Sequence, residues 1–293
     1  MTLFKKEEFK GIVVPLATPL KEDYSFHRLA MERLIEHVIE GGVNGLFVLG
    51  SAGEFPLFDD GESLSIVRFV LKQTSQRVPV YANASRNSTE HTLKIARELR
   101  KAGVDAVVLM TPFYYSAISQ DDLATHFLRI AEGGPAVLYN HPKTTKINIE
   151  VPTLEHLVNC SNIIGMKETS DDYERFSQVA RLLPTLQGGD DRLLESMKRG
   201  GKGGVCGLAN IAPGLFVRLI NAYNSERFEE AEELQKKIAE MKQTLYKTPA
   251  NAQVGVKQGL AYIGICQATM RPPMAQITKD QAGIINQYLR EKL

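Results

Sequence analysis

Short apolar runs alternate with longer segments of mixed polarity through most of the chain. Most of these runs are apolar at every position, which is typical of strands buried on both faces of a parallel sheet. We expect eight strands, at residues 11–17, 45–49, 78–83, 106–110, 136–139, 163–167, 186–188 and 204–207. Intervening segments place apolar residues at helical spacing. They predict helices at residues 27–40, 59–72, 89–101 and 120–132.

The last part of the chain lacks such strands. Three amphipathic segments remain there, at residues 226–246, 252–263 and 279–292. Eight strands, each followed by a helix or helical loop, favour an α/β fold in the form of a closed (β/α)8 TIM barrel. We therefore predict a barrel at residues 1–222 and a C-terminal helical region at residues 223–293. No linker rich in proline, glycine or serine separates them, so we expect the helical region to pack on the barrel.

An open, doubly wound parallel sheet would use the same alternation of strands and helices. Its usual phosphate-binding motif is absent, because the glycine-rich stretch at residues 200–207 does not match G-x-G-x-x-G. Gly201-Lys202 is not followed by serine or threonine, as a P-loop requires. We therefore interpret these glycines as allowing close backbone approach at a strand.

Composition excludes several classes of protein. The chain has 293 residues, 43% of them hydrophobic, with 35 basic against 34 acidic residues and a formal net charge of +1. That balance lacks the basic surface of a nucleic-acid-binding protein. No apolar run approaches the roughly 20 residues of a membrane span, and the first ten residues lack the apolar core of a secretory signal. We therefore expect a cytoplasmic protein with no nucleic-acid or membrane partner.

Cysteine and histidine spacing argues against metal sites and disulfides. The three cysteines are odd in number and widely spaced, which does not suit a disulfide framework or a structural zinc site. None of the six histidines forms an H-E-x-x-H pair. We predict neither a metal nor a cofactor.

A lysine ends the sixth predicted strand. Active sites of such barrels lie at the carboxyl ends of the strands, so Lys167 is a candidate for chemistry. Lysines ordinarily have a pKa of about 10.4, which burial can lower until a useful fraction is neutral at pH 7. A neutral amine condenses with a ketone to form a Schiff base, which accepts electrons when an adjacent C–C bond forms or breaks. Alternatively, Lys167 snorkels to solvent or pairs with Glu168.

Hydroxyl groups follow other predicted strands. Tyr139 ends the fifth strand, while Ser51 and Tyr114 lie just after the second and fourth. Together these hydroxyls could hold and relay a proton. Taken singly, Tyr139 could be a rim aromatic bonded to the backbone, and Ser51 part of a tight turn. Their coincidence with Lys167 at four strand ends favours a catalytic site.

These motifs resemble those of the dihydrodipicolinate synthase/N-acetylneuraminate lyase family, pyruvate-dependent class I aldolases and lyases built on a (β/α)8 barrel. The resemblance covers essentially the whole chain. It rests on the motifs GSAGE at 50–54, TPFYY at 111–115, YNHP at 139–142, GMKET at 165–169, GDD at 189–191 and RPPM at 271–274.

The resemblance implies a role for each matching residue. Lys167 would form the Schiff base with pyruvate, and Tyr139 would move protons during imine formation and C–C bond change. Ser51 would link Tyr139 to Tyr114, a tyrosine that the family often supplies from a neighbouring subunit of a homotetramer, a dimer of dimers. Val205 would line the pyruvate pocket.

Two departures from the family pattern concern the substrates. Ala52 stands where the family turn has a second hydroxyl residue, so only the backbone N–H groups of Ser51 and Ala52 would hold the pyruvate carboxylate. Dihydrodipicolinate synthases have an arginine after their Tyr-Asn-x-Pro motif that grips the aldehyde's carboxylate. The matching position here is Thr144, and the neighbouring Lys143 is only a point charge. This difference disfavours the synthase reaction.

Other positions resemble the sugar-acid lyases and 2-keto-3-deoxygluconate aldolases. Thr169 and Asp191 would contact substrate hydroxyls, and Gly189 would also bind substrate. Thr169 and Asp191 could instead be helix caps. The preferred hypothesis is a Schiff-base aldolase that cleaves, or reversibly forms, a 2-keto-3-deoxy sugar acid, giving pyruvate and an aldehyde.

Two alternatives remain open. The first is a dihydrodipicolinate synthase, which condenses pyruvate with aspartate semialdehyde. The second is a non-catalytic keto-acid-binding barrel, for which Ala52 is the best support. All of these ligands carry a carboxylate, whereas the chain is nearly neutral. We therefore expect Lys143, Lys146 and backbone N–H groups to attract them locally at the barrel mouth.

Overall fold

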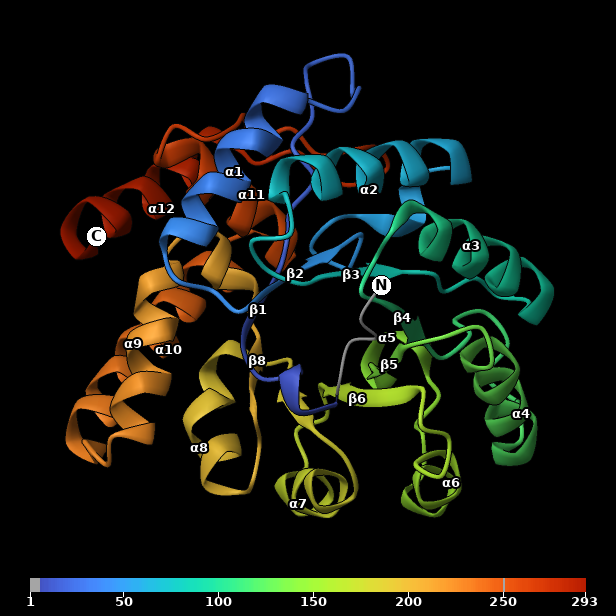
Figure 1. Cartoon of the computed structure of the whole chain (residues 1–293). Coiled ribbons are helices and arrows are strands. Elements are labelled where there is room, and N and C mark those ends of the chain that lie inside the picture. The colour runs from blue at the N-terminus through green and yellow to red at the C-terminus, as the bar shows by residue number, and fades with distance from the viewer. Residues whose placement is uncertain (1–5, 250) are drawn as a thin grey trace.

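The computed structural model describes residues 6–249 and 251–293, in which eight parallel strands form a closed barrel (Figure 1). The strands are β1 Gly11–Pro15, β2 Gly45–Val48, β3 Val80–Asn83, β4 Ala106–Met110, β5 Ala136–Asn140, β6 Ile163–Glu168, β7 Thr185–Gln187 and β8 Gly203–Val205. Each overlaps its predicted range, and each pairs with the next in sequence order. β8 returns to pair with β1, so the TIM barrel is confirmed and the open-sheet alternative is wrong.

Two glycines allow the barrel to close. Gly11 lies opposite Gly203 in the register of β1 and β8. Gly203 has a φ of +141°, and a Cβ atom there would lie 2.0 Å from the carbonyl oxygen of Gly11. No side chain fits that gap, so glycine is required at the seam. This confirms the interpretation of the glycine-rich stretch as a place of close backbone approach.

Helices surround the barrel as an outer ring (Figure 1). They are α1 Arg28–Glu40, α2 Asp60–Thr74, α3 Thr89–Ala102, α4 Gln120–Ala131, α5 Pro142–Thr145, α6 Val151–Leu157, α7 Tyr173–Leu182, α8 Leu193–Lys198 and α9 Pro213–Asn224. Side-chain caps fix several helix starts: Asp59 forms a capping box with Glu62 before α2, and Ser119 accepts a hydrogen bond from the backbone N–H of Asp122 in α4. The four helices predicted from periodicity are confirmed.

The centre of the barrel is apolar. Phe9 packs edge-on against Tyr81 at a ring-centroid distance of 5.4 Å. Val13, Phe47 and Val205 face the same interior space, and Lys167 also borders it. Burial of this layer removes apolar surface from water, the main stabilising contribution to folding. Lys167 is therefore a polar group at the top of an apolar core.

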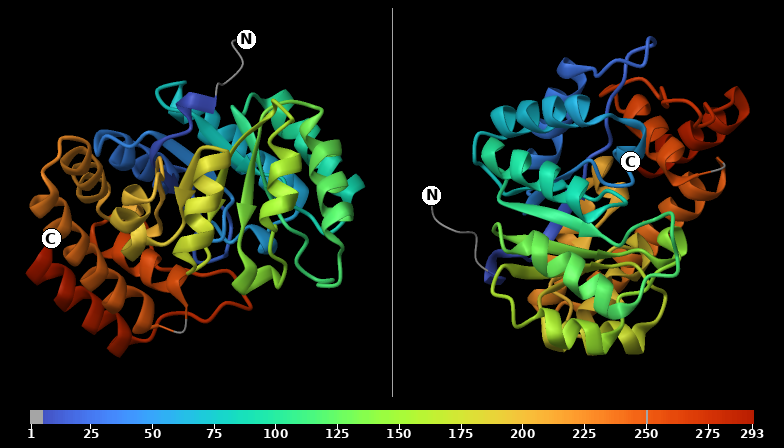
Figure 2. Two further views of the ribbon diagram at one scale, coloured as in Figure 1. Left: turned by 90° about the horizontal axis from the view of Figure 1, so that it is seen from below. Right: turned by 90° about the vertical axis from the view of Figure 1, so that its right-hand side faces the viewer.

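Three further helices complete the chain: α10 Phe228–Lys247, α11 Ala252–Tyr262 and α12 Lys279–Lys292. Figure 2 shows them together against one side of the barrel. Leu234, Ile238 and Met241 on α10 belong to the same hydrophobic core as the strands. The helical region therefore packs on the barrel as expected, while a domain division between residues 222 and 223 stays a prediction.

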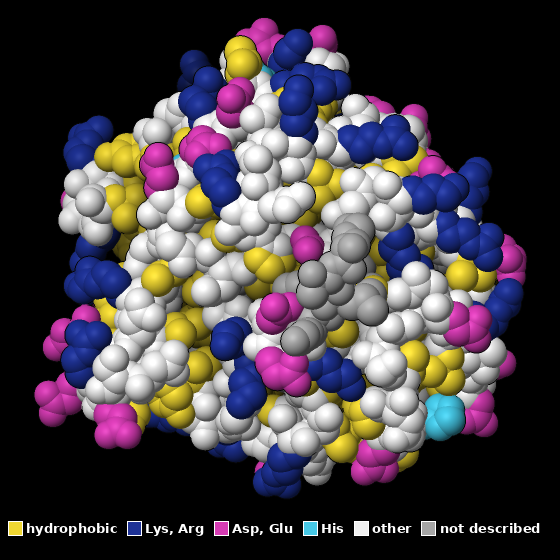
Figure 3. Space-filling view, in the orientation of Figure 1, with side chains coloured by type: hydrophobic (Ala, Val, Ile, Leu, Met, Phe, Trp, Pro, Cys, Tyr) yellow, Lys and Arg dark blue, Asp and Glu magenta, His cyan; other side chains and the backbone are white. Residues whose placement is uncertain are grey.

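Charged side chains of both signs occur around the rim of the face seen in Figure 3, with hydrophobic side chains between them. Within residues 6–249 and 251–293, no helix is both long enough and apolar enough to cross a membrane. The cytoplasmic location stays a prediction.

Candidate active site

A cavity of about 400 Å³ lies at the carboxyl ends of the strands, between the barrel and helices α10 and α11. Seven of the predicted site residues line it: Ser51, Ala52, Tyr139, Lys167, Thr169, Gly189 and Val205. In the described part of the chain, no three histidine, cysteine or acidic side chains gather to hold a metal ion. The cavity is where parallel barrels place their active sites.

Lys167 reaches this cavity from β6 and is 6% exposed. Its Nζ lies 4.1 Å from the centroid of the Tyr139 ring and 5.4 Å from that of Phe47. Tyr139 is its register partner on the adjacent strand β5. The two side chains that the sequence singled out therefore meet at the top of the core.

Glu168 points to the other face of β6, because successive side chains of a strand alternate. There it is fully buried, and its carboxylate pairs with Arg175 at 3.1 Å and accepts hydrogen bonds from Asn140. The suggestion that Lys167 pairs with Glu168 is therefore wrong.

The hydroxyl groups of Ser51 and Tyr139 lie 3.3 Å apart. Tyr139 is 2% exposed, so its hydroxyl has little access to bulk water. Tyr114 does not line the cavity, is 77% exposed and packs edge-on against Tyr115. One chain thus brings together two of the three expected relay members. A role for Tyr114 in a neighbouring subunit's site stays a prediction.

The turn after β2 carries Ser51 and Ala52 and is held by a buried ion pair. Glu54 and Lys257 of α11 are both almost fully buried, with their charged atoms 2.5 Å apart. Lys257 also donates to the backbone oxygen of Thr269 at 2.6 Å. Burial lowers the pKa of Lys257, and its attraction to Glu54 opposes that shift. The helical region therefore fixes this wall of the cavity.

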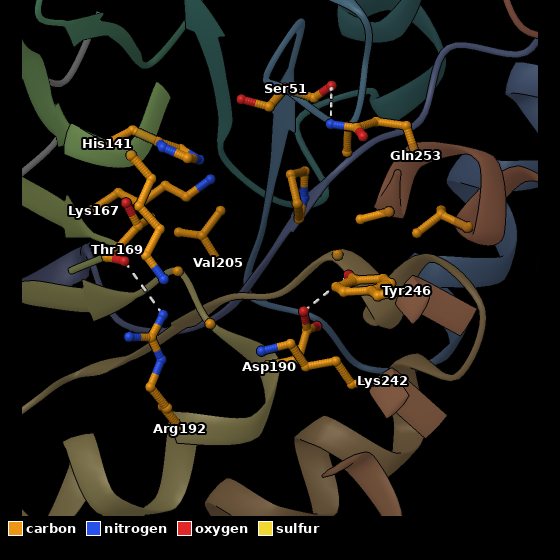
Figure 4. Close-up of a pocket in the computed structure, with 18 of the residues that line it drawn as sticks. Ser51, His141, Lys167, Thr169, Asp190, Arg192, Val205, Lys242, Tyr246 and Gln253 are labelled. Carbon is orange, nitrogen blue, oxygen red and sulfur yellow. Dashed lines mark hydrogen bonds between the residues drawn. The ribbon is translucent and has the colours of Figure 1, made fainter. Parts of the chain in front are cut away.

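Further contacts tie the same turn to the C-terminal region. Glu54 accepts from the backbone N–H of Arg271 at 2.9 Å. Gln253 of α11 donates to the backbone oxygen of Ser51 at 3.4 Å, as Figure 4 shows. Glu54 and Leu49 both have a φ of 58°, an uncommon conformation for residues other than glycine. These contacts keep the turn in a shape that its local sequence does not favour.

Asp190, not Asp191, lines the wall after β7. Its carboxylate accepts a hydrogen bond from Tyr246 of α10 at 2.9 Å (Figure 4). It also accepts one from the backbone N–H of Leu208 at 2.9 Å. Burial raises its pKa, although these donors oppose the shift. Asp191 pairs with Lys242 at 2.5 Å. The sequence analysis named Asp191 as a substrate contact, whereas the residue before it, Asp190, lines the cavity.

The Thr169 hydroxyl donates to the backbone oxygen of Asn140 at 2.6 Å. It does not cap a helix, because α7 is capped by Asp172. Asp191 is not a cap either, since the N-cap position of α8 is Arg192. The helix-cap alternatives for both residues are wrong, and their contact with substrate stays a prediction.

His141 is a cavity residue that sequence reasoning missed. Its ring lies 5.5 Å from that of Tyr139, and its Nδ1 is buried without a hydrogen-bond partner among the described residues. Burial, assisted by the nearby charge of Lys167, lowers the pKa of His141 to about 4. The ring is therefore neutral at pH 7.

Three cationic side chains besides Lys167 line the cavity: Lys143, Arg192 and Lys242. Only Lys143 was expected from the sequence. Lys146 donates to the backbone oxygen of Lys143 at 2.8 Å and is not part of the lining. The cavity thus has local positive charge as expected, but Arg192 and Lys242 supply it together with Lys143, and Lys146 does not line the cavity.

The chain matches the model of the dihydrodipicolinate synthetase family over residues 8–292. It is 31% identical to the 4-hydroxy-tetrahydrodipicolinate synthase of Thermodesulfovibrio yellowstonii, covering 96% of this chain and 98% of that protein. It is 33% identical to the enzyme of the same name from Endomicrobium trichonymphae, covering 97% and 98%.

Solved structures agree with these sequence relatives. YagE, a prophage protein of the dihydrodipicolinic acid synthase family from E. coli K12, is 26% identical and was solved in complex with pyruvate. It superposes with a TM-score of 0.92, covering 97% of this chain and 98% of YagE. The dihydrodipicolinate synthase of Thermotoga maritima gives a TM-score of 0.92 at 28% identity, covering 97% and 99%.

Proposed function

The chain belongs to the dihydrodipicolinate synthetase family, and we propose that it condenses pyruvate with aspartate semialdehyde through a Schiff base on Lys167. The observation that carries this proposal is the meeting of the Lys167 amine with Tyr139 and Ser51 at one cavity. The relatives favour this condensation over the sugar-acid cleavage that the sequence motifs had put first, because the two sequence relatives reported above are named synthases.

The first step joins pyruvate to the enzyme. The unprotonated amine of Lys167 adds to the ketone carbon, and Tyr139 passes a proton to the departing oxygen. Water leaves, and an iminium bond remains between Nζ and the former ketone carbon. Ser51, 3.3 Å from the Tyr139 hydroxyl, is placed to return the proton.

The second step forms the new C–C bond. The pyruvate methyl group then loses a proton to the Tyr139–Ser51 pair, which replaces the proton given up in the first step, and the iminium becomes an enamine whose carbon attacks the aldehyde. The aldehyde oxygen takes a proton from Tyr139, whose ring lies beside the Lys167 amine. Addition of water to the iminium then releases the product and restores the amine.

The turn after β2 would bind the pyruvate carboxylate. Ser51 and Ala52 line the cavity, and their backbone N–H groups would be the donors. Because Ala52 lacks the hydroxyl of the family pattern, we expect pyruvate to bind more weakly than with threonine there. Val205 would border the pyruvate methyl group.

Tyr114 would complete the proton relay of a second subunit. Its ring is 77% exposed and stands beside Tyr115, so a neighbouring chain can reach it. This proposal keeps the homotetramer implied by the family resemblance.

Product formation tests the substrate assignment directly. Purified enzyme is assayed for condensation of pyruvate with aspartate semialdehyde, and separately for pyruvate release from 2-keto-3-deoxygluconate. We expect condensation that disappears in K167A and persists in the control K198A, which changes an exposed lysine on α8. Pyruvate release alone would contradict the proposal and support the sugar-acid aldolase.

The sugar-acid aldolase is the second candidate, and the position of Thr169 in the cavity lining favours it. The non-catalytic binding barrel would be indicated by pyruvate affinity with neither reaction nor a trapped imine.

A further inference from the structure

We propose that Arg192, assisted by Lys143, binds the carboxylate of the aldehyde substrate. This inference rests on the proposed condensation and adds its specificity-determining residue. Arg192 ends the 3-10 turn Asp190–Arg192 after β7, whereas Thr144 occupies the family's arginine position after β5. The recognition of the aldehyde would therefore have moved from one strand end to another.

Arg192 is placed to face a ligand in the cavity. Its side chain is 15% exposed and lines the same space as Lys167. Figure 4 shows it extending toward Thr169, whose backbone oxygen accepts from Nη2 at 3.3 Å. Nη1 donates to the backbone oxygen of Ser170 at 2.6 Å. These contacts orient the guanidinium group on the side of the cavity where β6 ends.

The guanidinium group of Arg192 already has a carboxylate partner within the chain. Asp171 pairs through one oxygen with Arg192 and through the other with Lys143. The Lys143 hydrogen bond, with the nearby charge of Arg192, lowers the pKa of Asp171. Asp171 is 57% exposed, so water can solvate it once a substrate carboxylate takes its place. We call these three residues the Asp171 cluster.

Gly189 provides the room that the guanidinium group needs. A Cβ atom at this position would lie 2.5 Å from both Nε and Nη2 of Arg192. Any larger residue would push the guanidinium group away from the cavity wall. The predicted site residue Gly189 therefore acts by placing Arg192.

The local charges leave room for one more anion. Besides Lys167, the cations at this end of the cavity are Lys143, Arg192 and Lys242. The paired carboxylates are Asp171, shared between Lys143 and Arg192, and Asp191, bonded to Lys242. Three positive charges thus meet two negative ones. Asp190, the remaining acid, directs its carboxylate to the Tyr246 hydroxyl and to the backbone N–H of Leu208.

Paired aldehydes test the proposal. The variants R192M and R192K are assayed with pyruvate and either aspartate semialdehyde or its methyl ester, which keeps the amino group and lacks the carboxylate. For R192M we expect the KM for aspartate semialdehyde to rise about 10- to 100-fold, because a bidentate charged contact is lost. The KM for the ester and kcat should change less than about 2-fold. R192K should recover part of the loss.

Further variants separate a binding role from a structural one. Adding T144R to R192M restores an arginine at the family position and should lower the KM for aspartate semialdehyde again. D171N removes the internal competitor and should lower that KM in the wild-type background. R199M is the matched control, because Arg199 pairs with Glu195 outside the cavity lining. It should leave all parameters unchanged.

Borohydride trapping of the pyruvate imine distinguishes the possible failures. If the wild type traps pyruvate and condenses both aldehydes, an R192M effect that is absent or equal for the two aldehydes overturns the role of Arg192 alone. If R192M fails to fold, T144R and D171N are each tested in the wild-type background. An unchanged KM for aspartate semialdehyde in both variants overturns the proposal. A wild type that traps no pyruvate removes the proposed function and this inference together.

Discussion

The turn after β2 and the Asp171 cluster, of which Lys143 and Arg192 line the cavity, are held in place differently. The turn is fixed by the ion pair of Glu54 and Lys257, whose side chains are 1% and 0% exposed. In the Asp171 cluster, Lys143 and Asp171 are 68% and 57% exposed. Breaking a buried pair by removing one partner costs about 3–5 kcal/mol, whereas an exposed pair contributes about 0–1 kcal/mol.

This difference suggests that the two sides of the site serve different substrates. The buried side holds the groups proposed to handle pyruvate, which every member of a pyruvate-dependent family must bind. The exposed side holds the groups proposed to bind the second substrate. Changes there cost little stability, so the specificity of such a barrel can shift while its core chemistry is retained.

Tyr139 offers the largest expected effect on the buried side. Y139F should reduce kcat about 10²- to 10⁴-fold, the usual contribution of a positioned proton-transfer group. S51A should reduce kcat less, because Tyr139 retains its own hydroxyl. Steady-state assays of condensation measure both. Equal activity of Y139F and the wild type would remove the relay from the mechanism.

Removing Lys257 tests how firmly the turn is held. K257M leaves the Glu54 carboxylate buried without its cation and should lower the free energy of unfolding by about 3–5 kcal/mol. K143M, the matched change in the Asp171 cluster, should cost at most about 1 kcal/mol. Denaturant unfolding of both variants gives the comparison. Similar losses in the two would contradict the contrast between the regions.

Two buried histidines predict a pH dependence of stability. Burial lowers the pKa of His126, on the buried face of α4, and that of His141 in the cavity, to about 4 each. Between pH 6.5 and 4 these histidines are protonated in the unfolded chain but stay neutral in the folded chain. The free energy of unfolding therefore falls as the pH falls. Each histidine contributes about 1–3 kcal/mol to this loss.

Variants assign the slope to each histidine. H141N should flatten the pH dependence of the unfolding free energy by about as much as H126N. If H141N leaves the slope unchanged while H126N flattens it, the cavity wall at His141 is solvated, unlike the core.

The smallest expected effect concerns the pyruvate carboxylate. A52T restores the hydroxyl of the family pattern and should lower the KM for pyruvate about 3- to 10-fold, as one added hydrogen bond would. The KM for aspartate semialdehyde should stay the same, because the turn and the Asp171 cluster act on different substrates. A change in both constants would show that the two regions are coupled.

The barrel was predictable because its signals are local. Strands such as Ala106–Met110 are apolar at every position, and glycine or polar residues end them. The site residues Lys167 and Tyr139 stand at strand ends, where the fold alone brings them together. Periodicity and barrel topology therefore suffice to predict the barrel and the meeting of Lys167 with Tyr139.

The remaining parts of the site depend on distant partners or on side-chain direction. Glu54 and Lys257 are widely separated in the chain, and nothing near either residue indicates the other. Arg192 looks like an ordinary surface residue at the start of α8 until the Asp190–Arg192 turn directs it to the cavity. That same turn decides between Asp190 and Asp191, a choice that no periodicity could make.

The most direct test of the account is reduction of the enzyme with borohydride in the presence of pyruvate, followed by mass mapping of every lysine peptide. The account predicts a stable pyruvate adduct on Lys167 alone, and no adduct in K167A. An unmodified Lys167 under these conditions, or an adduct on another lysine such as Lys257, would contradict it.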